Sequence, residues 1–339
     1  MTLRFALLGA GRIGKVHAKA ITANPGAKLI AVADAMPKAA TDIAAQYGCE
    51  VRSIEQILAS ADIDAVVICT PTDTHADLIE KFSAAKKAIF CEKPIDLSVA
   101  RVEACLKVVD ANKTPLMVGF NRRFDPHFMA VRAAIDAGEI GTVEMVTIVS
   151  RDPGPPPLDY VKRSGGIFRD MTIHDFDMAR FLLGEEIVSV TAQASVLVDK
   201  AIGKAGDYDS VSVMLTTAKG KHATISNSRR ATYGYDQRIE VHGSHGSVAA
   251  ENPRGVSIEV APARGYTRPP LHDFFMTRYT EAYANEIAAF IAAVSSRKKA
   301  APSGKDGLIA LALAEAALKS VKEGRTVKVS EVLGKYLVR

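Results

Sequence analysis

Gly9-Ala10-Gly11-Arg12-Ile13-Gly14 lies between an apolar run, Arg4–Leu8, and a helical pattern over Ile13–Ala23. A G-x-G-x-x-G spacing that follows a strand and opens a helix predicts a dinucleotide-binding turn. The first glycine permits the tight turn, the second lets a pyrophosphate approach the backbone, and the third lets helix and strand pack closely. The free N–H groups at the start of the helix would then bind phosphate oxygens. The alternative is a tight turn without a ligand.

An acidic residue follows this turn at the expected distance. Asp34 ends the next apolar run, Lys28–Ala33. A carboxylate there accepts hydrogen bonds from the adenosine ribose and repels a 2′-phosphate. The next three residues, Ala35, Met36 and Pro37, supply no arginine to neutralise such a phosphate, and the nearest cation is Lys38. The sequence therefore favours NAD over NADP as the cofactor, although Asp34 could also act only as a helix N-cap.

Residues 1–121 alternate short apolar runs with helical patterns. This alternation predicts an α/β domain, a Rossmann doubly wound parallel sheet that binds ligands at the carboxyl ends of its strands. The expected strands are Arg4–Leu8, Lys28–Ala33, Ala65–Cys69, Ala88–Cys91 and Leu116–Val118, and the expected helices include Ile13–Ala23, Ala39–Tyr47 and Val99–Asn112.

The pattern changes in residues 122–339, which predict an α+β domain with an open antiparallel sheet for substrate binding and oligomerisation. The expected strands are Val143–Ser150, Ile187–Leu197, Ser210–Thr216, His222–Ser228, Gln237–His242 and Val256–Val260. The expected helices are Pro126–Ala137, Thr172–Leu183, Arg278–Ser295 and Lys305–Glu323. Since helices can cover only one face of this sheet, the other face predicts a homo-oligomer, either a dimer or a tetramer.

Composition narrows the class of protein. The chain has 339 residues, a formal net charge of +5 and only short basic runs, so we expect no nucleic-acid partner. Its four cysteines form no C-x-x-C pair, which predicts free thiols in a reducing compartment. No secretory signal is evident, and the longest uncharged stretch, Ile187–Val198, is too short to span a bilayer. A cytoplasmic protein without a membrane partner is expected.

Two further strand ends carry unusual polar residues. Thr70-Pro71-Thr72-Asp73-Thr74-His75 follows one strand, and Glu92-Lys93-Pro94 follows the next. Both would lie at the carboxyl edge of the sheet, beside the nicotinamide half of a cofactor. A lysine after a buried strand needs partners, so Lys93 is either a functional residue or a surface lysine paired with Glu92.

A candidate acid–base pair lies in the second half of the chain. Asp170 and His174 are four residues apart, so they share a face if the helix has begun by Asp170. Histidine suits a general base, and a neighbouring carboxylate can orient it. Alternatively, Asp170 or Thr172 is an N-cap and His174 is a core residue. We expect no metal site here, because adjacent residues such as His174 and Asp175 point apart on a helix.

These motifs together resemble the glucose–fructose oxidoreductase and inositol dehydrogenase (Gfo/Idh/MocA) family over essentially the whole chain. Most specific are Glu92-Lys93-Pro94 and the Asp-x-x-x-His spacing. The chain is most similar to the inositol 2-dehydrogenases, which implies NAD-dependent oxidation of myo-inositol to 2-keto-inositol. The resemblance implies that His174 takes the proton from the hydroxyl, Asp170 positions it, and Lys93 contacts the same hydroxyl. It also implies a cis peptide before Pro94.

The resemblance extends to binding residues. The cofactor would contact Gly9, Gly11, Arg12, Ile13, Gly14, Asp34, Thr70, Pro71, Thr72, His75, Glu92 and Lys93. The polyol would contact Arg123, Asp152, Asp170, His174, Tyr233 and Tyr235. The resemblance is least informative about substrate contacts in the proline-rich stretch 152–164, which we expect to be irregular.

Two other functions fit part of this pattern. A dehydrogenase of another polyol, aldose or sugar acid would share Lys93, Asp170 and His174. A dinucleotide-binding sensor without turnover would keep the glycine turn and lack the reaction centre, whose residues are present here.

Overall fold

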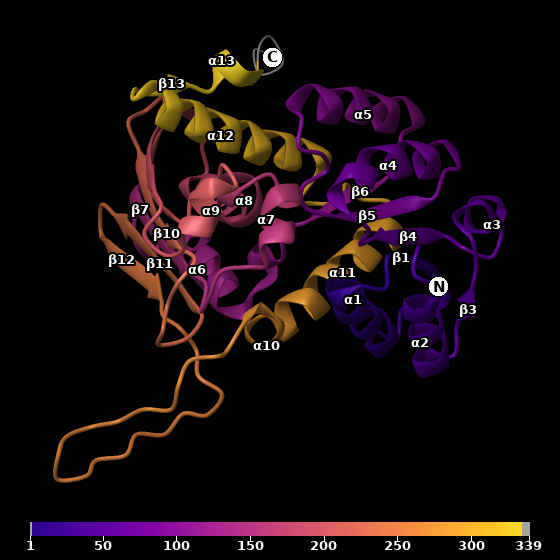
Figure 1. Cartoon of the computed structure of the whole chain (residues 1–339), viewed down its shortest axis with the longest axis horizontal. Coiled ribbons are helices and arrows are strands. Elements are labelled where there is room, and N and C mark those ends of the chain that lie inside the picture. The colour runs from indigo at the N-terminus through magenta and orange to yellow at the C-terminus, as the bar shows by residue number, and fades with distance from the viewer. Residues whose placement is uncertain (1, 334–339) are drawn as a thin grey trace. The chain divides into compact units, whose positions relative to one another are not determined.

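The computed structural model describes residues 2–333, which form two compact units (Figure 1). The first unit takes the chain up to Asp125 and the segment Glu281–Leu311. The second takes Pro126–Thr280 and, among the described residues, 312–333. Each unit is therefore built from two separate stretches of sequence. Within residues 2–333, every helix is too short or too polar to traverse a lipid bilayer.

A six-stranded parallel sheet forms the centre of the first unit, in the order β3-β2-β1-β4-β5-β6. Its strands are β1 (Leu3–Leu8), β2 (Ala27–Ala33), β3 (Glu50–Val51), β4 (Ala65–Ile68), β5 (Ala88–Glu92) and β6 (Leu116–Gly119). All five predicted strands are present, and the short β3 adds a sixth at one edge. The order reverses between β1 and β4, which is where a doubly wound sheet binds its ligand.

Helices cover this sheet because its strands are apolar on both faces. They are α1 (Arg12–Ala23), α2 (Pro37–Tyr47), α3 (Ile54–Ala59), α4 (His75–Ala84), α5 (Val99–Asn112) and α11 (Thr280–Ser295), with short 3₁₀ turns η1 (Thr72–Thr74) and η2 (Asn121–Phe124). Phe290 of α11 packs against Phe5 and Phe90, with ring centroids 6.1 and 5.9 Å apart. A helix from late in the sequence thus completes the core of the N-terminal sheet.

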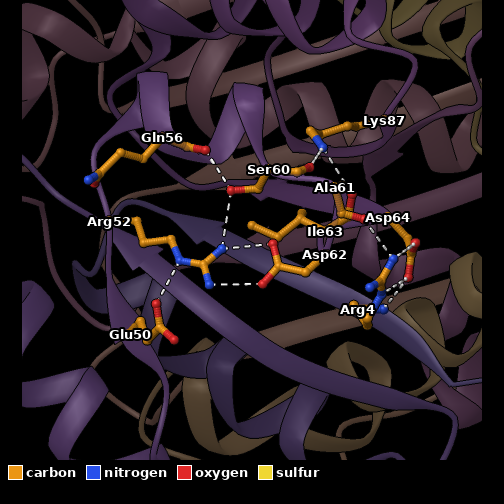
Figure 2. A network of polar contacts seen from close by, with 10 residues as sticks. All are labelled: Arg4, Glu50, Arg52, Gln56, Ser60, Ala61, Asp62, Ile63, Asp64 and Lys87. Carbon is orange, nitrogen blue, oxygen red and sulfur yellow. Dashed lines mark hydrogen bonds and ion pairs between the residues drawn. The ribbon is translucent and has the colours of Figure 1, made fainter.

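A polar network surrounds the loop between α3 and β4 (Figure 2). Arg4 at the start of β1 donates to Asp64 at 2.8 and 3.0 Å, and Arg52 donates to Asp62 at 2.8 and 2.9 Å. The buried ammonium of Lys87 donates to the carbonyl oxygens of Ser60 and Ile63. These contacts fasten the loop before β4 at the edge of the sheet opposite the glycine turn.

The second unit contains a seven-stranded sheet in the order β12-β11-β7-β10-β9-β8-β13. Its strands are β7 (Val143–Arg151), β8 (Ile187–Ser195), β9 (Ser210–Thr217), β10 (His222–Ser228), β11 (Asp236–Gly243), β12 (Gly246–Ala250) and β13 (Val327–Lys328). The predicted antiparallel pairing holds with one difference: β7 and β10 run parallel, so the sheet is mixed. These two strands are far apart in sequence, and a long crossover between them permits the parallel pairing.

Helices accompany this sheet. They are α6 (Pro126–Asp136), α7 (Leu158–Ser164), the π-helical turn η3 (Phe168–Thr172), α8 (Ile173–Leu183), α9 (Lys200–Lys204), α10 (Phe275–Arg278) and α13 (Ser330–Leu333), while the unit boundary falls within α12 (Gly304–Glu323). The expectation of an irregular stretch over 152–164 was wrong at α7. There the chain is helical, beginning after Pro157 and ending at Gly165, which has a left-handed φ of +82°.

The prediction of a strand over Val256–Val260 was also wrong. The chain between β12 and α10 leaves the sheet as a long excursion, drawn in orange in Figure 1. Its pairing is limited to isolated bridges, one of them between Val260 and Thr267. Alternating apolar residues predict a strand only where a neighbour covers them, and here Val256, Ile258 and Val260 are more than half exposed.

Candidate active site

The glycine turn has the geometry that its spacing predicts. Gly9 has a φ of +95°, and a Cβ atom there would lie 2.6 Å from the backbone of Cys69 at the end of β4. A Cβ atom on Gly14 would lie 2.0 Å from the carbonyl oxygen of Gly9. Around Gly11 nothing lies within 4 Å of the position of a Cβ atom, so this part of the turn is open. The turn is thus closed toward the sheet and open where a pyrophosphate would approach.

The start of α1 is available to an anion. Gly11 is its N-cap residue and supplies no side chain, so no side-chain cap engages the first N–H groups. Arg12 is exposed at the first turn, while Ile13 packs against the core of the unit. Backbone N–H groups and the positive end of the helix dipole suit a phosphate here.

Asp34 connects the end of β2 to this turn. Its Oδ2 atom accepts a hydrogen bond from the backbone N–H of Ala10 at 2.6 Å, and Oδ1 accepts one from Met36 at 2.7 Å. Each carboxylate oxygen can accept a further hydrogen bond, as a ribose would require. Lys38 pairs with Asp42 at 3.0 Å. The turn, the helix start and Asp34 together fit an adenine dinucleotide.

The polar segments after β4 and β5 are held side by side by His75. Its Nδ1 lies 2.8 Å from the carbonyl oxygen of Pro94, and its Nε2 lies 2.7 Å from that of Thr70. Burial lowers the pKa of this imidazole, while the two carbonyl contacts oppose the shift. The hydroxyl of Thr74 donates to the carbonyl oxygen of Pro71 at 2.8 Å. His75 is therefore a link between the two turns, and the peptide between Lys93 and Pro94 is cis, as the resemblance implies.

Glu92 points into the first unit. Its Oε1 atom lies 2.6 Å from Nε2 of His17, a fully buried histidine of α1. The buried Glu286 of α11 lies beside this pair. Sequence reasoning did not connect His17 or Glu286 with Glu92, because nothing local pairs either residue with it.

In the second unit, Asp170 lies in η3 and is held from two sides. Tyr160 of α7 donates its hydroxyl to Oδ1 at 2.8 Å, and the buried guanidinium of Arg229 lies 3.4 Å from Oδ2. Arg229 also lies 3.9 Å from Asp207, whose pKa is raised by burial. The π-helical turn means that α8 begins at Ile173, three residues after Asp170.

The residue after His174 anchors this helix to the sheet. The carboxylate of Asp175 accepts hydrogen bonds from Ser150 of β7 at 2.6 Å and Asn227 of β10 at 2.8 Å. Thr172 donates to the side-chain oxygen of Asn227 at 2.7 Å. Since Asp175 is directed to the sheet, the adjacent His174 occupies a different side of α8, as expected for neighbouring residues on a helix.

The predicted pocket residues fall into different local settings. Arg123, in η2 after β6, lies 3.2 Å from Asp306 in the first unit. In the second unit, Tyr233 donates to Asp236 at 2.6 Å. Tyr235 is buried, with its ring centroid 5.7 Å from that of Phe274.

Asp152 directly follows β7, and its backbone N–H donates to Ser228 at 2.9 Å. The first unit thus brings together the glycine turn, Asp34 and the turns at Thr70 and Lys93. The second unit places Asp170 and His174 on successive turns.

Sequence reasoning missed Tyr160, Arg229 and Glu286. Tyr160 lay in a stretch that was expected to be irregular, and Arg229 was one of two adjacent arginines at a strand end. No spacing signal could have connected any of the three to its partner, because each contact spans at least ten residues.

Comparison with known proteins places these observations in a family. Residues 3–120 match the oxidoreductase family with an NAD-binding Rossmann fold, and residues 128–249 match the GFO/IDH/MocA C-terminal domain. The chain is 76% identical over 330 residues to the inositol 2-dehydrogenase of Rhizobium meliloti (strain 1021), covering 97% of this chain and 100% of that protein.

Solved structures agree with these matches. A myo-inositol dehydrogenase from Corynebacterium glutamicum aligns with a TM-score of 0.94 and 45% identity, over 97% of this chain and 99% of that one. A scyllo-inositol dehydrogenase from Lactobacillus casei, with bound NAD(H) and scyllo-inositol, aligns with a TM-score of 0.91 and 29% identity, over 97% and 100%. The chain belongs to the GFO/IDH/MocA family of NAD-binding oxidoreductases.

Proposed function

We propose that the chain is an inositol 2-dehydrogenase that oxidises myo-inositol to 2-keto-inositol with NAD. The observation that carries this proposal is the 76% identity to an inositol 2-dehydrogenase over 97% of the chain, because it extends through both units. The relative from Corynebacterium glutamicum carries the same substrate in its name.

Three residues carry the proposed chemistry. His174 accepts the proton of the reacting hydroxyl, and Lys93 donates a hydrogen bond to the oxygen of that hydroxyl. Asp170 positions the substrate and His174, and its own carboxylate is oriented by Tyr160 and Arg229. When bound, NAD supplies the two-electron acceptor. Since histidine must be neutral to accept a proton, oxidation is expected to slow as the pH falls below neutrality.

The cofactor would be held by the turn and the adjoining strand ends. Gly9, Gly11 and Gly14 admit the pyrophosphate, and Asp34 accepts from the adenosine ribose. The remaining proposed contacts are Arg12, Ile13, Thr70, Pro71, Thr72, His75, Glu92 and Lys93. Of these, His75 and Glu92 act through the positions of the turns, since their polar atoms are engaged within the first unit.

The polyol would be bound by Arg123, Asp152, Asp170, His174, Tyr233 and Tyr235. Arginine, carboxylate and phenol groups suit a ring of hydroxyls, because each hydroxyl both donates and accepts.

We also propose separate functions for the two parts of the chain and a homo-oligomeric assembly. Residues 1–121 would bind NAD, and residues 122–339 would bind substrate and form a homotetramer or dimer through the open face of the mixed sheet. Met145 of β7 and Met214 of β9 support this, since both are about two-fifths or more exposed while their neighbours Val146 and Val213 are buried. A reducing, cytoplasmic location is supported by the four free cysteines.

NAD reduction by a panel of myo-inositol, scyllo-inositol and common aldoses tests the substrate. Turnover is expected with myo-inositol, and turnover restricted to an aldose would reject the substrate assignment. Lys93→Ala and His174→Ala are expected to lose turnover while still binding NAD. A wild type that binds NAD and oxidises no polyol would instead be a sensor.

A further inference from the structure

Three titratable side chains meet inside the first unit at the end of the strand that precedes Lys93. His17 comes from α1, Glu92 ends β5, and Glu286 comes from α11. The Nε2 atom of His17 lies 2.6 Å from Oε1 of Glu92 and 4.0 Å from Oε1 of Glu286. His17 and Glu286 are fully buried and Glu92 is 9% exposed, so water does not screen their charges.

The hydrogen-bonding groups of these three side chains indicate which of them carry a proton. An ionised carboxylate accepts and cannot donate, so the short contact directs the Nε2 proton of His17 toward Glu92. Neither oxygen of Glu286 has a hydrogen-bond partner among residues 2–333. A second carboxylate left ionised in this interior would be strongly disfavoured, whereas a protonated carboxyl is neutral and gains a donor. Burial, assisted by the charge of Glu92, raises the pKa of Glu286 well above its usual range.

Aromatic rings pack against the imidazole of this cluster. The His17 ring packs edge-on against Phe90 and Tyr283, with centroids 5.0 and 5.6 Å apart. Burial above all raises the pKa of the thiol of Cys69, which follows β4, and the nearby carboxyl group of Glu92 raises it further. Among residues 2–333, the titratable groups whose interactions with Glu286 are established are His17 from α1, Glu92 from β5 and Cys69 after β4, with Tyr283 of its own helix against the imidazole.

We propose that Glu286 is a positioning residue, a protonated acid on α11 that donates a hydrogen bond to the carboxylate of Glu92 and so fixes the strand end from which Lys93 extends. One polar atom from each of the three side chains lies within 4.8 Å of the others, which places the carboxyl group of Glu286 next to that of Glu92. The effect of Glu286 on turnover rests on the proposed function, because it acts through Lys93. The protonation of Glu286 does not depend on that function.

The proton is tested by unfolding the full chain in urea at several pH values, followed by circular dichroism. Glu286→Gln keeps the size of the side chain and a neutral N–H donor. Above a pH of about 5, the unfolded wild type loses a proton that the folded state retains, so wild-type stability falls with pH relative to the variant. The ratio of folding constants, variant to wild type, is expected to rise about tenfold per pH unit.

Ile287→Val is the matched control, because Ile287 is a fully buried apolar residue next along α11. Its ratio to wild type is expected to be independent of pH. A ratio for Glu286→Gln that is also flat from pH 5 to 8 would show that Glu286 is ionised in the folded state, and would overturn the proposal. So would a chelator, EDTA, that destabilises the wild type and not Glu286→Gln, since the cluster would then be a metal site.

The positioning role is tested by kinetics. Glu286→Leu removes the donor and is expected to lower kcat at least tenfold without changing the Kd for NAD, while Glu286→Gln restores kcat. Wild-type kcat in Glu286→Leu would refute positioning. If the wild type oxidises no inositol, the proposed function fails, and the urea experiment still reports whether Glu286 holds its proton.

Discussion

Removal of the Asp34 carboxylate separates two ways in which this residue contributes to cofactor binding. In the structure it accepts hydrogen bonds from the N–H groups of Ala10 and Met36, at 2.6 and 2.7 Å. These bonds are not equivalent, because Ala10 is 1% exposed and Met36 is 67% exposed. In Asp34→Ala the amide of Met36 gains water, while that of Ala10 stays buried without an acceptor.

The sizes of the two effects follow from this difference. A buried donor left without a partner costs about 1–3 kcal/mol, so the variant is expected to be less stable by roughly that amount even without cofactor. The ribose also loses its charged acceptor, and a loss of about 3 kcal/mol in binding weakens NAD by on the order of 100-fold. The Kd for NADP is expected to change less, because repulsion of the 2′-phosphate disappears with the charge.

Calorimetric titration with NAD and NADP measures both affinities, and thermal unfolding without cofactor measures the first effect. Asp34→Asn is the control, since its amide oxygen can still accept from Ala10 while the charge is gone. It is expected to unfold near the wild-type temperature and still to discriminate less between the cofactors. A ratio of NADP to NAD affinity that stays at its wild-type value in both variants would refute this account of selectivity.

Three other substitutions test separate parts of the structure. Gly14→Ala is expected to abolish NAD binding and to lower Tm, because its Cβ atom would lie 2.0 Å from a backbone oxygen; thermal unfolding with and without NAD measures both effects. Arg52 lowers the pKa of Asp62, so their contact stabilises the fold above a pH of about 4 and is lost as the pH falls through the lowered pKa. The Tm difference between wild type and Arg52→Gln is therefore expected at neutral pH and should shrink in acid, and a difference that grows in acid would contradict it (Figure 2). Tyr160→Phe removes one hydrogen bond to Asp170 and is expected to lower kcat about fivefold with little change in Tm, whereas an unchanged kcat would exclude a role for that contact.

Most of the parallel sheet could be predicted because its signals are local. The strand over Arg4–Leu8, the glycine turn and Asp34 are connected through neighbouring residues, and each has a specific stereochemical reason. The same local reasoning predicted a helix over Thr172–Leu183, with His174 in its first turn and Asp170 just before it. It did not predict the π-helical turn over Phe168–Thr172, which contains Asp170 and directly precedes α8.

Local reasoning was wrong where the outcome depended on a distant neighbour. Val256–Val260 has the alternation of a strand but no adjacent strand to extend, so it stays exposed. The parallel pairing of β7 with β10 was not predicted either, because strand direction is decided by the whole crossover and not by either strand alone.

The conformational requirements of the backbone depend on the residue type at each position. For that reason the G-x-G-x-x-G turn, its helix and the acid that follows could be predicted from the sequence alone. Buried polar groups are different, because their partners are chosen by packing. That Asp170 would be held by Tyr160 and Arg229, and that Glu92 would meet His17 and Glu286, required the folded chain. A carboxylate in a low-dielectric interior must take whichever donor the fold brings within about 3 Å, and no spacing along the chain encodes that distance.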